Sequence, residues 1–574
     1  MTRRADRIAD ARLAVFVAGL AVGAAAWWGY VPWLALLLPG AGFVALMVLH
    51  EQTHRARDLA RLGVTLYSEL SARAGVGGTP PACGFEPMLA VPSPHLYASD
   101  FDLFGRGGLF ELLCRARTLV GAKTLAGWLL APALPVVVVA RQTAVKELID
   151  LHDLREALAL TAGAVQAAVS EDDLRRWSGE PARLGVGWRL PVACVLAALA
   201  VLALPAVLFG FAGAPVLVLS ANILFLFSCR GGIIALDNSL SPIGRELKTL
   251  SAVLALLERA PFSAPLLREQ QAQLLTGTES ASQAIRRLES LALGFDVYRN
   301  QLFAVIAIYT LWPFWWGWAI EGWRARHRDA LHHQWMQALG QLEALCSIAG
   351  YASERDEDAW PEFVEGDARY EANALGHPLL PVGARVRNDV ALGPQLPLLM
   401  VSGSNMSGKS TLLRAIGLSV ALAHAGGPVC ARRAVLTPLQ IGAVIRVEDS
   451  IQRGASRFYA EIERFKAVLD VSEGKLPVLF LCDEILHGTN TRDRVEGAKA
   501  LIRALMLRGG IGLVTTHDLA LTEFVAEIPN ANNVHFQDDI VEGRLAFDYR
   551  LREGVVTKSN ALDLMRAIGL PVEP

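Results

Sequence analysis

Four long apolar runs, grouped in two close pairs, dominate the first 230 residues of the chain. The first pair covers residues 13–28 and 31–49, and the second pair covers residues 190–209 and 212–228. Each run has about the length that a helix needs to cross the hydrocarbon core of a bilayer. Only a few uncharged residues separate the two runs of each pair, so the pattern predicts two helical hairpins in a membrane.

The charges that flank these hairpins indicate their orientation. Basic residues lie beside the open ends of both pairs, which by the positive-inside rule places those ends in the cytoplasm. Two alternatives stay open: the first run as a cleaved signal peptide, and the second pair as a hairpin in a buried core. A second apolar run follows the first at once, which disfavours a signal peptide. The flanking basic residues are Arg3, Arg4, Arg7, Arg55, Arg57, Arg61, Arg183, Arg189 and Arg230.

A fifth apolar run, residues 301–320, is ambiguous. It lacks charged residues, but arginines follow it at 324, 326 and 328, so both of its flanks resemble cytoplasmic ends. A crossing there would place the last third of the chain on the opposite side from residues 51–186. Its cluster of tryptophans is typical of a membrane–water interface. We expect a buried or interfacial helix, with a membrane crossing as the alternative.

Two further stretches show the periodicity of helices. Residues 241–300 and 321–350 repeat apolar residues at helical spacing, as in Leu247, Leu250 and Leu254. Residues 353–371 are acidic and irregular, which is typical of a junction between domains.

Composition supports the membrane segments and excludes several classes of protein. Hydrophobic residues make up 53% of the 574 residues and charged residues only 19%, which is unusual for a soluble chain. The formal net charge of -2 argues against a chain built mainly to coat nucleic acid. The seven cysteines include no Cys-x-x-Cys pair, so neither a disulfide framework nor a zinc ribbon is expected. Scattered thiols fit a reducing, cytosolic setting.

A phosphate-binding motif follows the apolar residues 397–402, which predict a buried strand. Residues 403–410 read G-x-x-x-x-G-K-S, and a helical pattern comes next. The backbone N–H groups of such a loop and the helix N-terminus attract phosphate. We expect Lys409 to reach the β- and γ-phosphates of ATP and Ser410 to bind Mg²⁺; a glycine-rich turn without nucleotide is the alternative. The predicted nucleotide-binding residues are Gly403, Asn405, Met406, Ser407, Gly408, Lys409, Ser410 and Thr411.

Three more candidate residues follow two other predicted strands. Asp483 and Glu484 come directly after the apolar residues 478–482, and His517 follows residues 511–516. An acidic residue at the end of a buried strand beside a phosphate loop is suited to hold Mg²⁺, which predicts this role for Asp483. Glu484 would orient or deprotonate the attacking water, and His517 would contact the γ-phosphate or that water. The alternatives are a solvated acidic pair and a capping or surface histidine.

Ser456 is a candidate for a second anion contact. It precedes a helical stretch at residues 459–469 and is placed to cap that helix. A helix N-terminus with a free hydroxyl also binds anions, so Ser456 is a candidate ligand of a γ-phosphate as well.

Together these motifs resemble the ATPase domain of the MutS mismatch-repair family, a branch of the ABC-type ATPases. The resemblance is carried by GSNMSGKST, EDSIQRGASRFYAEI, VLFLCDEILHGTNT and TTHDLALT, in that order. Upstream, Gly376-His377-Pro378 and Asn388-Asp389 are similar to the family's segment before the phosphate loop. The resemblance covers roughly residues 370–570. More weakly, residues 105–160 are similar to the start of the family's lever domain.

This resemblance implies an ATP hydrolase that works as a homodimer with ATP and Mg²⁺. Gly454 and Ser456 of one subunit would face the γ-phosphate bound at Lys409 of the other, and residues 488–490 would lie at the dimer seam. The resemblance leaves the adenine contact open, because Arg385 lies near where the family has an aromatic residue. The residues expected to act in catalysis are Lys409, Glu484 and His517, and those expected to bind Mg²⁺ are Ser410 and Asp483.

The N-terminal half departs from the family. Before residue 105 nothing resembles the mismatch-reading domain, and no Phe-x-Glu element appears there. The second hairpin falls within the presumed lever region, where the family has its DNA clamp. No basic stripe with interleaved aromatic residues is visible on the parts expected to be soluble. The departures predict membrane insertion in place of the clamp, and they put mismatch recognition in doubt.

We therefore predict an α-helical membrane and lever region followed by a C-terminal α/β P-loop ATPase domain of the ABC-type, MutS-like kind. The expected localisation is the cytoplasmic membrane, with several crossings and with the ATPase domain in the cytoplasm. The predicted domains are a transmembrane hairpin at 1–50, a cytoplasmic helical region with the start of the lever at 51–186, a second hairpin at 187–230, helical levers at 231–352 and the ATPase domain at 353–574.

The function predicted from the sequence is that of a membrane-anchored ATPase that transmits its dimer changes through the levers; its protein partner is not identified. A DNA-repair or DNA-binding protein tethered to the membrane is the first alternative. An ABC-type half-transporter is the second, although the position of an LSGGQ-like signature reads Arg453-Gly454-Ala455-Ser456. A scaffold that binds ATP as a slow switch is the third.

Overall fold

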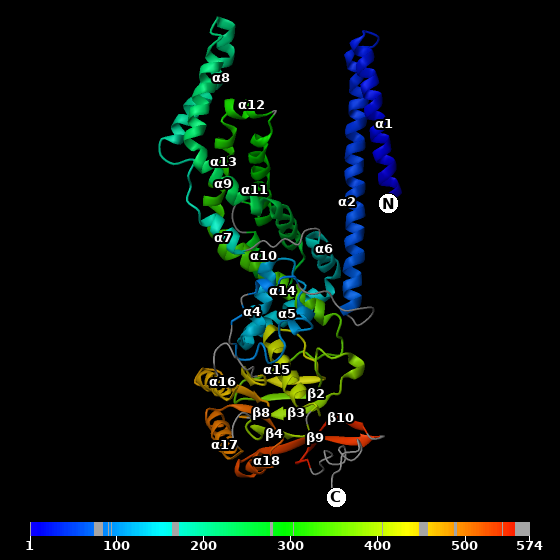
Figure 1. Cartoon of the computed structure of the whole chain (residues 1–574), viewed down its shortest axis with the longest axis vertical. Coiled ribbons are helices and arrows are strands. Elements are labelled where there is room, and N and C mark those ends of the chain that lie inside the picture. The colour runs from blue at the N-terminus through cyan, green and yellow to red at the C-terminus, as the bar shows by residue number, and fades with distance from the viewer. Residues whose placement is uncertain are drawn as a thin grey trace. The chain divides into compact units, whose positions relative to one another are not determined.

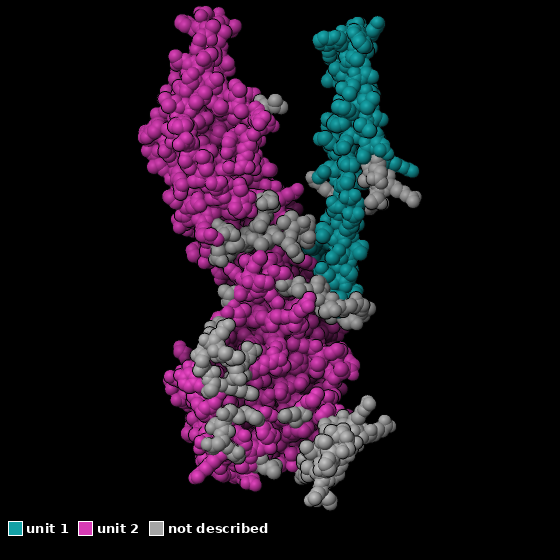
Figure 2. Space-filling model, in the orientation of Figure 1, with its two compact units in different colours: residues 1–81, 156–166 teal, residues 82–155, 167–574 magenta. Residues whose placement is uncertain are grey.

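The computed structural model describes residues 2–73, 84–89, 91–92, 95–163, 171–275, 279–301, 303–404, 406–446, 457–486, 491–541 and 544–556. The chain divides into two compact units (Figure 2). The first consists of residues 1–81 and 156–166, and the second of residues 82–155 and 167–574. The domain boundaries expected from the sequence stay predictions.

The first unit contains a helical hairpin. Gly29, with φ +78°, lies in the turn between the two long helices, and small residues let them approach: a Cβ at Gly19 would lie 3.5 Å from Pro39 Cβ. Large apolar side chains such as Leu38 and Trp27 are exposed. Such a surface is unfavourable in water and suits a lipid environment. The elements of this unit are α1 (Thr2–Trp27), η1 (Trp33–Leu36), α2 (Leu37–Arg73) and the larger part of α6 (His152–Gly163).

The second unit begins with a helical part. The second long helical hairpin of the chain lies in this part and turns at Gly210, which has a left-handed φ of +89°. The helices of this part are α3 (Leu109–Leu113), α4 (Leu119–Leu130), α5 (Pro135–Asp150), α7 (Glu171–Gly179), α8 (Arg189–Ala206), α9 (Ala214–Arg259), α10 (Pro265–Leu274), α11 (Ala281–Asp296), α12 (Ala304–Tyr309), α13 (Trp312–Ala330) and α14 (Met336–Ala352). Short 3-10 helices lie at η2 (Glu86–Met88), η3 (Val207–Phe209) and η4 (Val297–Arg299).

The predicted hairpins correspond to long apolar helices. Within the described residues, four helices are long and apolar enough to cross a membrane, and they lie in α1, α2, α8 and α9. α9 continues to Arg259, far beyond the apolar run at 212–228. The ambiguous run at 301–320 is not one helix: it breaks into α12 and α13 at Leu311, whose φ is +53°. That run is not among the four candidate spans.

A continuous helical path runs through the second unit. α13 passes through a π-helical turn, η5 (Leu331–Trp335), directly into α14. α14 is buried on nearly all sides and packs on α4 and α5. The crossing with α4 is close, because a Cβ at Gly340 would lie 3.0 Å from Val120 Cγ1.

The C-terminal part of the second unit is an α/β domain with two sheets (Figure 1). The larger sheet has the order β10-β9-β4-β8-β7-β6, in which only β10 runs antiparallel to its neighbour. Its strands are β4 (Leu398–Ser402), β6 (Gln440–Val444), β7 (Val478–Cys482), β8 (Ile511–Thr516), β9 (Ala531–Val541) and β10 (Arg544–Glu553). The smaller sheet is β1 (Glu362–Phe363), β5 (Arg433–Leu436), β2 (Tyr370–Leu375) and β3 (Asn388–Leu392), in spatial order.

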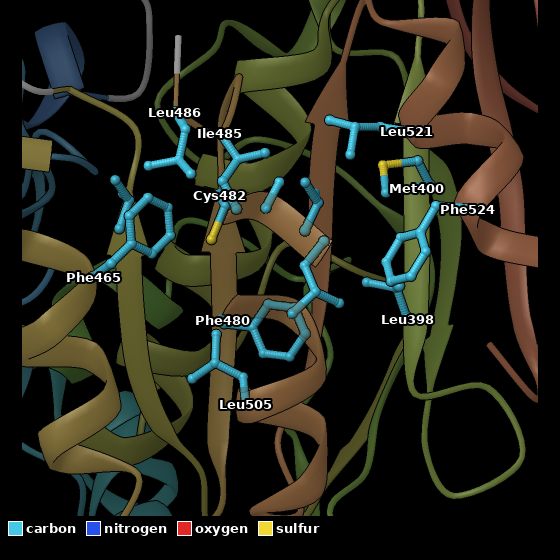
Figure 3. Packing of buried hydrophobic residues seen from close by; sticks show 14 of the residues in the cluster. Leu398, Met400, Phe465, Phe480, Cys482, Ile485, Leu486, Leu505, Leu521 and Phe524 are labelled. Atoms are coloured by element: carbon cyan, nitrogen blue, oxygen red, sulfur yellow. The ribbon is translucent and has the colours of Figure 1, made fainter. Parts of the chain in front are cut away.

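Helices cover the larger sheet and bury its apolar strands. They are α15 (Lys409–Ala425), α16 (Arg457–Val471), α17 (Thr491–Leu507) and α18 (Leu519–Phe524). Phe480 of β7 and Leu398 of β4 are fully buried in a core that Phe465 of α16 and Phe524 of α18 complete (Figure 3). β4, β7 and β8 are buried along their whole length, as strands covered on both faces should be. The expected arrangement of a helical N-terminal region and a C-terminal α/β domain is confirmed.

Candidate functional site

The loop between β4 and α15 has the backbone that its glycines predict. Gly403, Met406 and Gly408 all have left-handed φ values, of +149°, +71° and +108°. A Cβ at Gly403 would lie 2.9 Å from Ser407 Oγ and 3.0 Å from the carbonyl oxygen of Phe536, so only glycine fits there. Asn405 lies outside the described residues. The loop therefore curls tightly at the carboxyl end of a central strand, where ligands of α/β sheets bind.

Lys409 is held over this loop. Its Nζ donates hydrogen bonds to the carbonyl oxygens of Gly403 at 2.9 Å and Ser404 at 2.8 Å, and the side chain is buried. Burial lowers the pKa of Lys409, while Glu484 and Asp483 act in the opposite direction. A buried ammonium group held by neutral carbonyls is suited to bind an anion.

Two hydroxyl groups of the loop offer further contacts for an anion. The Oγ atoms of Ser404 and Ser407 are buried, and no hydrogen-bond partner for either lies within the described part of the chain. Met406 and Thr411 are exposed. Buried hydroxyls are normally hydrogen-bonded, so the pair fits a loop that accepts phosphate oxygens.

Asp483 connects the phosphate loop to the neighbouring strands. Its carboxylate accepts hydrogen bonds from Ser410 Oγ and Thr515 Oγ1, each at 2.5 Å. β8 lies between β4 and β7 in the sheet, so Thr515 of β8 bridges the gap between the two motifs. The hydroxyl of Ser410 and the carboxylate of Asp483 are the hard oxygen donors that Mg²⁺ prefers.

Mg²⁺ would need ligands beyond these two side chains. Within the described residues, no group of three or more His, Cys, Asp or Glu side chains could hold a metal ion. Mg²⁺ is commonly bound through one or two protein oxygens, with nucleotide phosphates and water completing its shell. The residues present therefore fit a metal that arrives with a nucleotide.

Glu484 and His517 meet at the same edge of the sheet. His517 Nδ1 lies 3.5 Å from Glu484 Oε1, and both side chains are partly exposed. The backbone N–H of Glu484 donates to Thr515 Oγ1 at 3.0 Å, and its φ of +51° is left-handed. A strained backbone at a site edge is typical of functional residues. The carboxylate and the imidazole thus lie next to each other, partly exposed, and the charge of Glu484 acts on Lys409.

The structure brings together most residues expected at the site. The described ones that converge are Gly403, Ser407, Gly408, Lys409, Ser410, Asp483, Glu484 and His517. Ser456, Gly454 and residues 488–490 lie outside the described residues, so their expected roles stay predictions. The helix predicted at 459–469 is present as α16.

Sequence reasoning missed three residues at or near the site. Thr515 opens the segment TTHDLALT, but only His517 of that segment was given a role. Tyr549 of β10 lies beside the loop: a Cβ at Gly408 would be 3.2 Å from Tyr549 Cδ1. Asp100 is fully buried and accepts the backbone amides of Ile445 at 2.8 Å and Arg446 at 2.9 Å. No local pattern marks Asp100, because its partners lie more than 340 residues away.

Comparison with known proteins finds similarity over the C-terminal part of the chain. Residues 399–573 match the family model described as MutS domain V. This part of the chain is therefore similar to domain V of MutS proteins. The MutS-like domain is similar to Endonuclease MutS2 of Thermus thermophilus, with 34% identity over 239 residues, which are 42% of this chain and 31% of that protein.

Two more relatives show the same extent of similarity. DNA mismatch repair protein MutS of Natronomonas pharaonis is 32% identical over 245 residues, 41% of this chain and 27% of its own length. Endonuclease MutS2 of Thermomicrobium roseum is 32% identical over 238 residues, 41% of this chain and 30% of its own length. The chain thus spans less than a third of these relatives.

Proposed function

We propose that this chain is a membrane-anchored, MutS-like ATPase that binds and hydrolyses Mg-ATP as a homodimer and passes the change through helical levers. The observation that carries the proposal is the convergence of Lys409, Ser410 and Asp483 at the carboxyl edge of a parallel sheet. These groups supply an ammonium for phosphate and two oxygens for a cation. The MutS domain V match supports this reading of the site.

In the proposed hydrolysis of ATP, each side chain of the site has one role. Lys409 binds the β- and γ-phosphates and offsets their charge. Glu484 holds the attacking water and accepts its proton at a carboxylate oxygen as the water oxygen bonds to the γ-phosphorus and ADP leaves. His517, beside Glu484 Oε1, orients that carboxylate. Mg²⁺, bound at Ser410 and Asp483, would supply further neutralisation of phosphate charge.

The lever function rests on buried contacts made by each of the two helices, α13 and α14. At the hairpin end, Glu321 accepts the backbone amide of Leu184 at 3.0 Å, just before α8. Arg324 donates to the carbonyl oxygens of Trp177 and Pro181, at 3.2 Å each. At the other end, Glu343 of α14 accepts the backbone amide of Thr118 at 3.2 Å. A stiff element fastened at both ends can transmit a displacement.

Membrane anchoring and the cytoplasmic position of the ATPase domain are part of the same proposal. Their support is the length and apolar composition of four helices, together with the exposed apolar side chains on α8 and α9, such as Leu202 and Leu224. Dimerisation is supported only by the family resemblance, in which Ser456 would complete the partner's site.

The experiment is ATP hydrolysis by the full chain in detergent. We expect Lys409→Ala to lose nucleotide binding and hydrolysis, and Glu484→Gln to keep binding while hydrolysis falls about 100-fold or more, as for loss of a general base. Lys475→Ala, an exposed lysine at the opposite end of β7, is the matched control and should keep full activity. Full hydrolysis in either site variant would overturn the assignment.

A DNA-binding protein tethered to the membrane is the second candidate, because the relatives are named as a mismatch repair protein and endonucleases. Binding of matched, mismatched and single-stranded DNA across a salt series separates the two functions. Selective binding that depends on nucleotide would favour DNA repair. Binding that vanishes by physiological salt would leave the membrane ATPase as the better account.

A further inference from the structure

The chain between α11 and α13 turns back on itself. α11 and α13 pack against each other, and Trp312 Nε1 at the start of α13 donates to the carbonyl oxygen of Gly294 near the end of α11 at 2.7 Å. α12 caps the two helices at that end (Figure 1). Residues 303–311 therefore leave and return at the same end of a helical pair.

This turn is fastened to the middle of the second hairpin. Tyr309 donates its hydroxyl to the carbonyl oxygen of Ala200 in α8 at 2.8 Å. Asn222 of α9, which is fully buried, donates its Nδ2 to the carbonyl oxygen of Tyr309 at 2.7 Å. Tyr309 also packs against the apolar cluster of Ala200, Ala203 and Val218. Both helices of the hairpin thus hold α12 directly.

These contacts set the depth of α12 along the hairpin. The charged end of the hairpin lies at Arg189, whose Nη2 donates to the carbonyl oxygen of Ser228 at 3.5 Å. Ala200 is eleven residues beyond Arg189, which at 1.5 Å per residue is about 16 Å farther along α8. Asn222, which also holds Tyr309, is only six residues before Ser228, about 9 Å along α9. α12 therefore lies roughly 9–16 Å inside the charged end of the hairpin, between the surface and the middle of a hydrocarbon core that is about 30 Å thick.

The outer face of α12 is apolar. Val305 and Ile306 are 66% and 53% exposed, and residues 300–320 contain no Asp, Glu, Lys or Arg. Charges stop at Arg299, which forms ion pairs with Asp237 of α9 and with Asp296. The indole rings of Trp312 and Trp316 lie on the α13 side of the turn, with centroids 5.2 Å apart. Charges and indole rings below an apolar tip are the order expected at a membrane surface.

We infer that residues 303–311 form a re-entrant segment whose apolar face contacts the acyl chains of the bilayer beside the hairpin. The segment enters and leaves on the same side, which explains why both flanks of the run carry cytoplasmic charge patterns. Its backbone groups form hydrogen bonds within the segment: the N–H of Thr310 donates to Ile306 O at 2.9 Å, and the N–H of Leu311 donates to Ile308 O at 3.2 Å. Irregular backbone at membrane depth requires such satisfaction. The inference rests on the proposed membrane anchoring.

The test uses the unmodified full chain in vesicles of phosphatidylethanolamine and phosphatidylglycerol that contain a phospholipid with a photoreactive diazirine deep in its acyl chain. After illumination, trypsin separates the regions of interest without any mutation, because no Lys or Arg lies within 190–229, 300–323 or 329–354. Mass spectrometry then locates the lipid adducts. We expect adducts on residues 303–309 and on the hairpin peptide, and none on the 329–355 peptide, which covers buried α14.

Each outcome has one meaning. Adducts on the hairpin peptide without adducts on residues 303–309 would overturn the re-entrant segment and leave the membrane anchor standing. An unlabelled hairpin peptide would overturn membrane insertion of the second hairpin and this inference with it. Adducts on all three peptides would show labelling of unfolded protein and would count against the segment, because α14 is buried in the folded chain.

Discussion

Arg464 of α16 forms an ion pair with Asp100, a fully buried carboxylate that also accepts the backbone amides at the end of β6. β6 ends before the segment that contains Gly454 and Ser456, and α16 begins directly after it. Asp102, two residues on, pairs with Arg414 of α15 at 3.1 Å and with Arg446. One short segment ahead of α3 is therefore tied to the helix after the phosphate loop and to the helix after Ser456.

This relationship predicts that Asp100→Asn uncouples the helical part from the α/β domain. Removing one member of a buried ion pair costs about 3–5 kcal/mol, so the melting temperature of the full chain in detergent should fall by several degrees. Asp102→Asn is the matched control: its side chain is 39% exposed, and such pairs contribute about 0–1 kcal/mol. Equal losses for the two variants would contradict a special role for Asp100.

A second prediction concerns Thr515. Its hydroxyl donates to Asp483 and accepts the backbone N–H of Glu484, so it orients both acidic residues. Thr515→Val keeps the shape of the side chain but leaves these groups without their partner. Outer-shell partners of metal ligands typically contribute about 10–100-fold to metal affinity or activity. The Mg²⁺ concentration for half-maximal ATP hydrolysis should rise within that range.

A control variant at a buried hydroxyl remote from Asp483 distinguishes a change in Mg²⁺ binding from a general loss of stability. Ser419 of α15 donates to the carbonyl oxygen of Ile416 at 2.7 Å and contacts Tyr370 Oη, away from Asp483. Ser419→Ala should leave the Mg²⁺ dependence unchanged. An unchanged Mg²⁺ requirement in Thr515→Val would show that Asp483 keeps its orientation without the threonine.

A third prediction concerns the ring of Tyr549. It lies beside Gly408 at the mouth of the loop and is 42% exposed, and Asn388 Nδ2 holds its backbone carbonyl at 3.0 Å. An exposed aromatic ring beside a phosphate site is suited to stack on a base, worth about 1–3 kcal/mol. Tyr549→Ala should weaken ATP binding by roughly 5–100-fold, whereas Tyr549→Phe should bind normally. Isothermal titration with inorganic triphosphate, which has no base, should show no difference between the variants.

The site residues with local signals were predictable from the sequence. Lys409, Asp483 and His517 each follow a short apolar strand, and parallel strands place their carboxyl ends at one edge. The order of those strands was not predictable, because pairing partners are distant in sequence; β8 between β4 and β7 makes Thr515 the bridge. Asp100 was not predictable as a contact residue for the same reason, because its partners are distant in sequence.

The helical part of the chain shows a different limit of prediction from sequence. Periodicity and length located the hairpins, because apolar runs of that length are rare elsewhere. The run at 301–320 has the composition of one helix, and its break depends on the left-handed backbone of Leu311, a residue that carries no turn signal. Asn222 of α9 and Tyr309 are about 90 residues apart in sequence. The hydrogen bond between them decides where that run lies.

Glu343 links α14 to the residues at the start of α4 through hydrogen bonds, and its protonation predicts how stability depends on pH. Its carboxylate accepts hydrogen bonds from Thr118 Oγ1 at 2.5 Å and from the backbone amides of Arg117 and Thr118 at 3.2 Å each. Burial raises the pKa of Glu343 to about 7, against an ordinary value of 4.5, although the hydrogen bonds act in the opposite direction. The folded chain therefore binds this proton more tightly than the unfolded chain.

The sign of the pH dependence follows from that raised pKa. The stabilising contribution of Glu343 is fully present below about pH 4.5, where both states are protonated, and it is lost as the pH rises through about 7. Between these values, the titration of Glu343 should lower the free energy of unfolding by about 1.4 kcal/mol for each pH unit. Glu343→Gln, which cannot ionise, should flatten the fall in melting temperature from pH 5 to pH 7.5, whereas Glu357→Gln on the surface should not. Parallel melting curves for wild type and Glu343→Gln would show that Glu343 does not titrate in this range.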